Sequence, residues 1–403
     1  MTLARISFAY LRKRRSSTLL NVVLLAFAVG AVTLLLLTGS QLEERIRRDA
    51  HGIDLVVGAK GSETQLILAA VYALDDPGGS MSWSEAQEIA AHRGVRRAIP
   101  LAFGDHYFGF RIVGTSHDYV ALHGARLARG RLWGKPLEAV VGADVALRLR
   151  PEIGSTFEPV HAVTGASGIA HPEHDYRIVG VLERTGSVLD GLILTGLESY
   201  WTLHPAKPRP DEYGLIAEPP ADPRTVNALL LQYDVSHVAR EVPYVVAAYP
   251  HLQAASPAEH SARMHGILAI STDLIRIFAV VLIASAVLSM FIALYGSLSE
   301  RRYDLAVMRT LGATRERIMG LLLFEGFVLA FAGALLGLAL GHALTSVLGL
   351  ALHQAEQVSV TGMRWHPGEP LIVLATLLLG TITALLPAWR AHEVDIAATL
   401  ARG

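Results

Sequence analysis

Four stretches of this chain are long, apolar and free of charged side chains, and they limit what it can fold into. They cover residues 16–42, 277–299, 326–355 and 370–389. A bilayer core of ~30 Å is crossed by ~20 apolar residues in a helix that rises ~1.5 Å per residue. Each stretch meets that length, so we expect a membrane protein with four transmembrane α-helices.

The composition agrees with a membrane protein that carries a sizeable soluble part. Of 403 residues, 52% are hydrophobic and 18% are charged, and the mean hydropathy is +0.38. The net charge of -1 argues against a nucleic-acid partner, whereas membrane lipid is an expected one. Because the chain has no cysteine, disulfides, thiolate metal sites and cysteine nucleophiles are excluded.

The placement of arginines predicts the orientation of the spans. A basic cluster, Arg12–Arg15, precedes the first apolar stretch, and five arginines lie in segment 299–317. Cytoplasmic loops carry such an excess of positive charge, so both segments and both termini are expected in the cytoplasm. A cleaved signal peptide is the alternative for the first stretch, but its apolar region is typically ~7–15 residues long.

This orientation divides the chain into alternating segments. The expected order is a cytoplasmic N-terminal segment 1–15, spans 16–42, 267–298, 318–348 and 370–389, an extracytoplasmic insert 43–266 after the first span, a cytoplasmic coupling helix 299–317, an extracytoplasmic loop 349–369 and a cytoplasmic tail 390–403.

The insert is predicted to be a mixed α/β domain. Ser82 and Glu85 have the spacing of a capping box and predict a helix that continues to about His92. Pro257 is typical of the first turn of a helix that leads into the second span. Residues 41–48 continue the first span, and we expect the two helices to pair as a stalk. Strands are expected at 108–114, 139–141, 176–182 and 191–194.

The charged segment between the second and third spans is suited to docking. Leu305, Met308 and Leu311 recur at three-residue steps and predict an apolar stripe that fits a groove. A solvated linker is the alternative. The candidate coupling residues are Glu300, Arg301, Arg302, Asp304, Leu305, Met308, Arg309, Leu311 and Gly312.

Two features of the third span predict close helix packing. Gly333, Gly337 and Gly341 recur every four residues, so they share one helix face that a second helix can approach closely. That helix belongs either to the same chain or to a second copy at a dimer seam. Glu325 is expected to make a polar contact inside the bundle.

A histidine-rich stretch of the insert could hold a metal ion. His161, His171, Glu173 and His174 combine imidazole and carboxylate groups, which are good zinc ligands, although a solvated polar loop has the same composition. Gly58–Ser62 has the wrong spacing for a phosphate-binding loop, and no hydrolase or zinc-protease motif occurs. We therefore expect no enzymatic activity in this chain.

Three parts of the chain carry a resemblance to one known family. Residues 300–313 resemble its coupling helix, although Asp304 stands where a glutamate is common. The ending at 387–400 is similar to the family's ending, but it lacks the usual proline. The order of four stretches in the insert resembles the family's periplasmic core domain: 129–133, 138–146, 152–157 and 178–182. With these stretches the chain resembles the permease subunits of the MacB/LolC/FtsX-type ABC transporters.

The resemblance implies a subunit that works by mechanotransmission in a bacterial cytoplasmic (inner) membrane. Two permease copies would bind two copies of a separate ATPase, which would hold ATP and magnesium. Closure of the ATPase would then move the periplasmic insert and act on a substrate, lipoprotein or adaptor outside the membrane. The alternative is an FtsX-like regulator that relays the state of the ATPase to a cell-wall enzyme without transport.

Overall fold

The computed structural model describes most of the chain as two compact units. The bundle unit comprises Met1–Leu42 and Ile267–Gly403, and the insert unit comprises Glu43–Gly266. The residues that the structure describes are 7, 12, 15–76, 78–161, 169–170, 175–204, 222–233, 238–300, 308–356 and 360–392.

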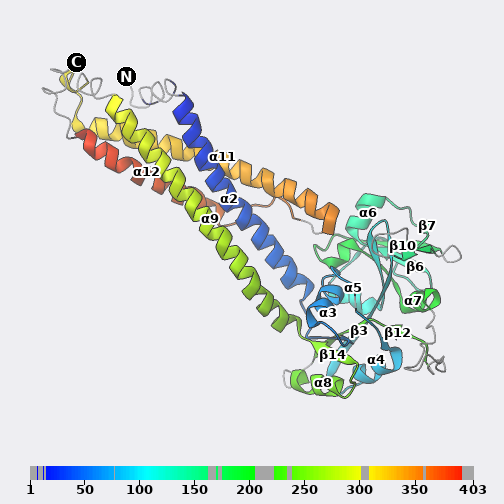
Figure 1. Cartoon of the computed structure of the whole chain (residues 1–403). Helices are drawn as coiled ribbons and strands as arrows, with labels where there is room; N and C mark the ends of the chain where they lie inside the picture. Colours follow the sequence, from blue (N-terminus) through cyan, green and yellow to red (C-terminus); the bar gives the residue numbers. More distant parts are fainter. Residues whose placement is uncertain are drawn as a thin grey trace. The chain divides into compact units, whose positions relative to one another are not determined.

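Long helices make up the bundle unit, and Figure 1 labels them along the chain. Among the described residues three are long and apolar enough to cross a membrane, over Arg15–Asp49, Arg315–Leu352 and Glu369–Trp389. A fourth long helix, α9, contains a shorter apolar stretch, Val280–Gly296. The long helices are α2 (Arg15–Asp49), α9 (Pro257–Glu300), α11 (Arg315–Glu356) and α12 (Glu369–His392).

Small residues bring α11 and α12 close together. A Cβ atom at Gly326 would lie 2.7 Å from the Cβ of Ala384 and 3.1 Å from the carbonyl oxygen of Gly380. Gly380 in turn lies against Ala330. In a membrane, where lipid competes with apolar side chains, such close backbone approach is a main source of helix association.

A polar contact joins α2 to α9 within the same unit. The hydroxyl of Ser289 donates a hydrogen bond to the side-chain oxygen of Asn21 over 3.0 Å. Asn21 is itself buried and donates from its amide nitrogen to the carbonyl oxygen of Ser17. Because apolar surroundings make unpaired polar groups costly, this contact fixes the facing sides of the two helices.

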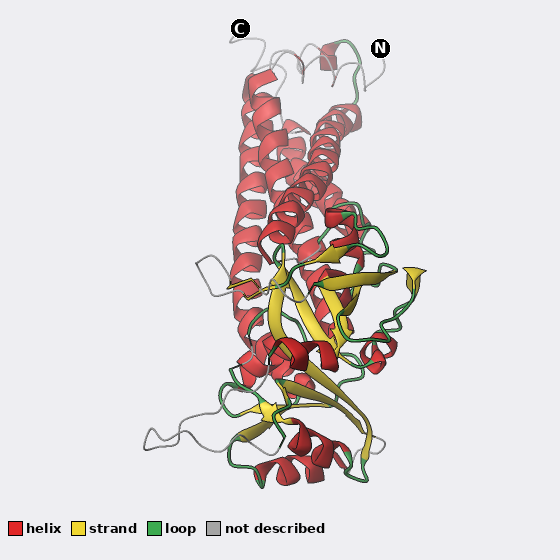
Figure 2. Cartoon of the chain, turned by 90° about the vertical axis from the view of Figure 1, so that its right-hand side faces the viewer, coloured by secondary structure: helices red, strands yellow, loops and turns green. Residues whose placement is uncertain are grey.

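The insert unit is built on one large sheet, drawn yellow in Figure 2. Along the sheet the described strands follow the order β14-β1-β13-β3-β4-β11-β6-β10-β5, with β7, β8 and β9 attached beside this path. The pairs β4–β11 and β6–β10 are parallel, and the other neighbours on the path are antiparallel. A separate small sheet pairs β2 with β12.

The strands of the insert unit have the following bounds: β1 (Leu55–Ala59), β2 (Met81–Ser82), β3 (Val95–Tyr107), β4 (Phe110–Thr115), β5 (Leu127–Gly130), β6 (Glu138–Val141), β7 (Thr156–Phe157), β8 (Val160–His161), β9 (Ile169–Ala170), β10 (Tyr176–Leu182), β11 (Leu192–Gly196), β12 (Thr225–Val226), β13 (Ala228–Tyr233) and β14 (Leu252–Ala255). The helices are α3 (Glu63–Ala70), α4 (Trp83–Ala90), α5 (His117–Leu122), α6 (Ala143–Leu149), η1 (Val188–Gly191), α7 (Leu197–Leu203) and α8 (Val238–Ala247).

Both faces of this sheet are buried, which explains why its central strands are almost wholly apolar. Val56 and Leu230 pack into a cluster with α3 and α5 on one face, whereas Val57 and Leu229 pack with α4 and α8 on the other. Side chains alternate between the faces of a strand, so a run of consecutive apolar residues needs cover on both. Farther along the sheet, Ile193 belongs to a third cluster with α6.

Several local predictions for the insert are confirmed. Ser82 accepts a hydrogen bond from the amide of Glu85 over 3.2 Å, and the Glu85 carboxylate accepts one from the amide of Ser82 over 3.0 Å, which completes the capping box. The strand expected at 176–182 is β10, and the helix expected after Ser256 begins at Pro257. The insert is therefore a mixed α/β domain.

The end of α2 is anchored inside the insert unit by a buried carboxylate. Asp49 is 1% exposed, and it accepts a hydrogen bond from the amide of Val188 over 2.8 Å. Arg48 donates to the carbonyl oxygen of Gly186, two residues before η1 begins. Burial raises the pKa of Asp49 to about 6, although Arg45 and the amide of Val188 oppose the change.

We predict that Asp49→Asn stabilises the protein at alkaline pH. Because the pKa of Asp49 is raised, the folded state holds the proton of this carboxyl more tightly than the unfolded state does. Protonation of Asp49 therefore stabilises the fold fully below pH 3.8, and this stabilisation is lost as pH rises through about 6. Asparagine keeps the acceptor for Val188 without the buried charge. The gain in unfolding free energy should be about 3 kcal/mol at pH 8 and about 1 kcal/mol at pH 4.5.

Thermal unfolding of the full-length protein in detergent at the two pH values measures this difference. Asp49→Ala serves as the control, because it removes both the charge and the acceptor for Val188. An equal change of the unfolding midpoint at both pH values in the asparagine variant would contradict the prediction.

Candidate functional site

The predicted coupling segment is described in part. Glu300 is the last residue of α9, and Arg301, Arg302, Asp304 and Leu305 lie outside the described residues. Met308 and Arg309 form a helical turn that ends before α11 begins at Arg315. The structure thus describes residues 308–314 of the segment.

A tight helix end shapes this part of the segment. Gly312 has a φ of +94°, which favours glycine because other residues rarely adopt it. Its amide donates to the carbonyl oxygen of Arg309 over 3.0 Å, and the amide of Ala313 donates to that of Met308 over 2.9 Å. Two such bonds around a glycine are typical of a helix C-cap. The hydroxyl of Thr314 accepts from the amide of Arg317 and starts α11.

Met308 and Leu311 do not lie in the same environment. Met308 is partly buried and packs against Ile318 and Leu322 of α11 and Ala388 of α12. Leu311 is 82% exposed. The part of the predicted stripe that the structure describes is therefore split, because Met308 packs against its own bundle and Leu311 is exposed.

The glycine face of α11 lies against α2 of the same chain. A Cβ atom at Gly337 would be 2.5 Å from the Cβ of Val29 and 2.9 Å from the carbonyl oxygen of Ala26. At Gly341 it would be 2.5 Å from the Cβ of Thr33. Gly333 faces Leu25 at 2.7 Å. Of the two alternatives for this face, the described geometry is that of packing within the monomer.

The remaining predicted residues lie apart from this region. Glu325 is buried on α11, next to the glycine contact between α11 and α12. His161 belongs to β8 and pairs through its backbone with Ile169, whereas His171, Glu173 and His174 lie outside the described residues. Among the residues that are described, no group of three or more candidate ligands can hold a metal ion. The zinc site stays a prediction.

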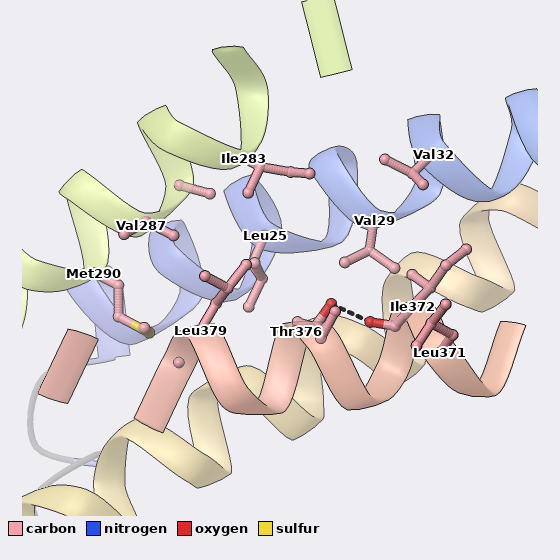
Figure 3. Close-up of a pocket in the computed structure, with 13 residues that line it drawn as sticks. Leu25, Val29, Val32, Ile283, Val287, Met290, Leu371, Ile372, Thr376 and Leu379 are labelled. Carbon is pink, nitrogen blue, oxygen red and sulfur yellow. Dashed lines mark hydrogen bonds between the residues drawn. The ribbon is translucent and has the colours of Figure 1, made fainter. Parts of the chain in front are cut away.

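The bundle unit also contains an apolar cavity of about 200 Å³ between α2, α9 and α12. Figure 3 shows that aliphatic side chains and Met290 point into it. The hydroxyl in its lining belongs to Thr376 and already donates to the carbonyl oxygen of Ile372 over 2.7 Å. The cavity can therefore accommodate hydrocarbon, but its lining offers no free polar group that would select a ligand.

Sequence reasoning missed a polar cluster at the connection between α11 and α12. It contains Gln41 of α2, His342 of α11 and Glu369 at the start of α12. Histidine within an otherwise apolar stretch was the available signal, because polar residues inside spans usually have a partner.

We predict that Gly337→Ala destabilises the bundle, whereas Gly320→Ala on the same helix does not. Alanine favours a helix by about 1 kcal/mol over glycine, and nothing lies within 4 Å of a Cβ atom at Gly320. At Gly337 the added methyl meets Val29 and the backbone of α2, and such overpacking costs about 1–3 kcal/mol. Thermal unfolding in detergent compares the two variants. Equal unfolding midpoints would contradict the close contact of Gly337 with α2.

The chain is similar to known permeases along most of its length. Residues 18–233 match the MacB-like periplasmic core domain family, and residues 276–392 match the FtsX-like permease C-terminal family. The lipoprotein-releasing system transmembrane protein LolC of Xylella fastidiosa is 22% identical over 98% of this chain and 97% of that protein. The uncharacterized ABC transporter permease YknZ of Bacillus subtilis is 33% identical over 25% of this chain and 23% of that protein.

Among solved structures, the periplasmic region of MacB from Actinobacillus actinomycetemcomitans aligns with 55% of this chain and 96% of its own length, at 12% identity and a TM-score of 0.36. The two family matches together cover the insert and the helices that follow it. This chain therefore belongs to the MacB/LolC/FtsX-type family of ABC transporter permeases.

Proposed function

We propose that this permease converts ATP-driven motion of a separate ATPase into motion of the insert unit outside the cytoplasmic membrane. The substrate is engaged there, and this chain contributes neither a nucleotide site nor a catalytic site. Two copies of the permease assemble with the ATPase. The observation that carries this proposal is the continuity of two helices across the boundary between the units.

Both helices that join the units run without interruption. α2 extends from Arg15 to Asp49, although the bundle unit ends at Leu42, and α9 begins at Pro257, before the bundle unit resumes at Ile267. A continuous helix transmits displacement along its axis because its backbone hydrogen bonds resist stretching. At its far end α2 is fixed by Asp49 and Arg48, so a movement of α2 reaches η1 directly.

The proposed orientation has four spans, both termini in the cytoplasm and the insert unit in the periplasm. The arginines of segment 299–317 support a cytoplasmic location for the turn at Gly312. Leu311 is then exposed on the side where an ATPase would bind. Met308 holds this turn on α11 and α12, so a force on Leu311 is passed to both helices.

A lipoprotein is the substrate class that we put first. A relative that aligns with nearly the whole chain is named as part of a lipoprotein-releasing system. The match of the insert to a MacB-like core domain is the reason to prefer transport over the FtsX-like regulatory alternative. An adaptor or lipoprotein in the periplasm would bind the insert unit.

We predict that cysteines at Ser84 and Thr310 differ in labelling by a membrane-impermeant reagent. The chain has no cysteine of its own, Ser84 belongs to the insert unit, and Thr310 lies in the proposed cytoplasmic turn. In intact spheroplasts the Ser84 site should react and the Thr310 site should react only after lysis. Labelling of the Thr310 site in intact spheroplasts would contradict the orientation.

We predict that Leu311→Asp prevents the ATPase from binding without unfolding the permease. An exposed aspartate costs the free permease little, but burying it unpaired in an apolar groove costs several kcal/mol. Co-purification should therefore retain at least about tenfold less ATPase, since about 1.4 kcal/mol corresponds to a factor of ten. Leu311→Met is the control and should retain the ATPase.

Met308→Asp separates docking from folding. Because Met308 packs against Ile318 and Leu322, this change should lower the unfolding midpoint of the permease itself, which Leu311→Asp should leave unaltered. Normal ATPase retention by Leu311→Asp would contradict the proposed contact.

A further inference from the structure

A polar cavity of about 420 Å³ lies at the end of α2, within the insert unit. Its lining comes from the last turns of α2, from the turn that follows this helix and from the end of α5: Glu44, Arg47, Arg48, His51, Leu122 and His123. Ligand pockets usually measure ~300–1,000 Å³, so the polar cavity is large enough for a ligand. Unlike the cavity in the bundle unit, it is lined by charged and hydrogen-bonding side chains.

Arg48 is built into the wall of the polar cavity. Its guanidinium donates to the carbonyl oxygens of Gly186 over 3.0 Å and Thr185 over 3.4 Å, and to the carboxylate of Glu44 over 2.5 Å. Gly186 has a φ of +70°, and a Cβ atom there would collide with Nη1 of Arg48. Glycine therefore leaves the room in which this guanidinium is held, and Glu44 balances its charge.

Arg47 and His51 lie one turn apart in the same lining and are not held in this way. In the part of the chain that the structure describes, neither side chain makes a hydrogen bond or an ion pair. The carboxylates of Glu44 and Asp49 pair with other arginines of α2. The positive charge of Arg47 is therefore not balanced by the carboxylates around the polar cavity.

His123 is a second sign that the polar cavity takes up a ligand. Its Nε2 atom is buried, and no hydrogen-bond partner for it occurs among the described residues. Burial lowers the pKa of His123 to about 4, so at pH 7 the imidazole is neutral and contributes hydrogen bonding without charge. Buried polar atoms are normally paired, so this imidazole indicates that a polar group is missing beside it.

These side chains suit a phosphate group. A guanidinium presents parallel N–H donors that match the oxygens of a phosphate, and an imidazole can donate to a further oxygen. A cationic ligand would be repelled by Arg47, and an apolar ligand would leave both Arg47 and His123 without partners. The lining therefore selects an anion that has several oxygens.

The position of the polar cavity along α2 favours the phosphate of a membrane lipid. The charge-free stretch of α2 ends at Leu42, and a rise of ~1.5 Å per residue puts Arg47 only ~8 Å farther along the helix axis. Headgroups form a layer of ~5–8 Å on each side of the hydrocarbon core. A long basic side chain close to the end of a span can reach this layer, where anionic lipids attract it.

We propose that the polar cavity binds the phosphodiester of an anionic membrane lipid, with Arg47 and His51 as ligands and Arg48 as a fixed part of the wall. The bound lipid ties the anchored end of α2 to the membrane surface. This site requires that α2 spans the membrane, but it depends neither on the direction of insertion nor on an ATPase.

Binding of phosphatidylglycerol to the full-length protein in neutral detergent tests the site. Ala121 is exposed beside the polar cavity, and the chain has no cysteine, so Ala121→Cys accepts a single fluorescent label. We expect the fluorescence to follow a saturable curve as the mole fraction of phosphatidylglycerol in the micelles rises. Phosphatidylcholine has the same phosphodiester without a net charge, and it should bind more weakly.

The decisive variant combines Arg47→Gln with Glu43→Gln. Glu43 is exposed on the same helix and is not part of the lining, so the two changes together keep the net charge of the wild type. A diffuse attraction between α2 and anionic lipid should then persist, whereas loss of a charge-assisted contact should weaken binding about tenfold or more. Glu43→Gln alone is the control and should bind like the wild type, and His51→Ala should bind more weakly.

Three outcomes would overturn the proposal. Wild-type affinity in the double variant would show that the lipid responds only to net charge. Equal binding of phosphatidylcholine would remove the requirement for an anionic lipid. The same fluorescence curve with inorganic phosphate alone would show that the ligand is a free anion. Both substituted side chains are exposed and make no ion pair in the described part of the chain, so the unfolding midpoint of the double variant should match the wild type.

Discussion

The need to satisfy every backbone hydrogen bond inside a bilayer is the constraint on which this structure depends. A spanning segment of a bundle protein meets it by staying helical throughout. In α2 and α9 the helix does not stop where the bundle unit ends, but continues into the insert unit. The same backbone hydrogen bonding that makes a span helical therefore continues in both helices beyond the bundle unit.

Polar groups fix the C-terminal part of α2 at two points. Asp49 holds the end of α2 against Val188 in the insert unit, at the cost of a buried carboxyl whose pKa is raised. Within the bundle unit, Gln41 holds the same helix to Thr361, in the connection between α11 and α12. Earlier in α2, from Leu25 to Thr33, the contacts with α11 are made at glycines, which allow a close approach but offer no polar specificity. The polar contacts of α2 with Val188 and Thr361 therefore both lie in its C-terminal part.

The sequence predicted elements whose signal is local. The capping box at Ser82 and the helix start at Pro257 depend on a few neighbouring residues, and both were found at the expected positions. Strand β10 was likewise found at its expected bounds, because its apolar run is bounded by residues typical of turns. The glycine spacing on α11 predicted a close contact, but spacing alone does not identify the helix on the other side.

What the sequence could not predict depends on tertiary contacts. Three-residue spacing placed Met308 and Leu311 on one stripe, whereas the helix ends at Gly312 and leaves them in different surroundings. The hydrogen-bond partners of His342 come from two other segments of the chain, so these contacts are not visible in sequence spacing.

The most direct test of transmission through α2 and α9 is a nucleotide-dependent distance between labels at Ser84 and Thr310 in the assembled transporter. Seven alanines inserted after Leu42 and after Gly266 keep both helices continuous and nearly in phase, since seven residues make about two turns. Seven glycines at the same positions break them. The account predicts that the distance change survives the alanine insertions and disappears with the glycine insertions, while ATP hydrolysis continues in both. A change of the same size in the glycine variant would contradict it.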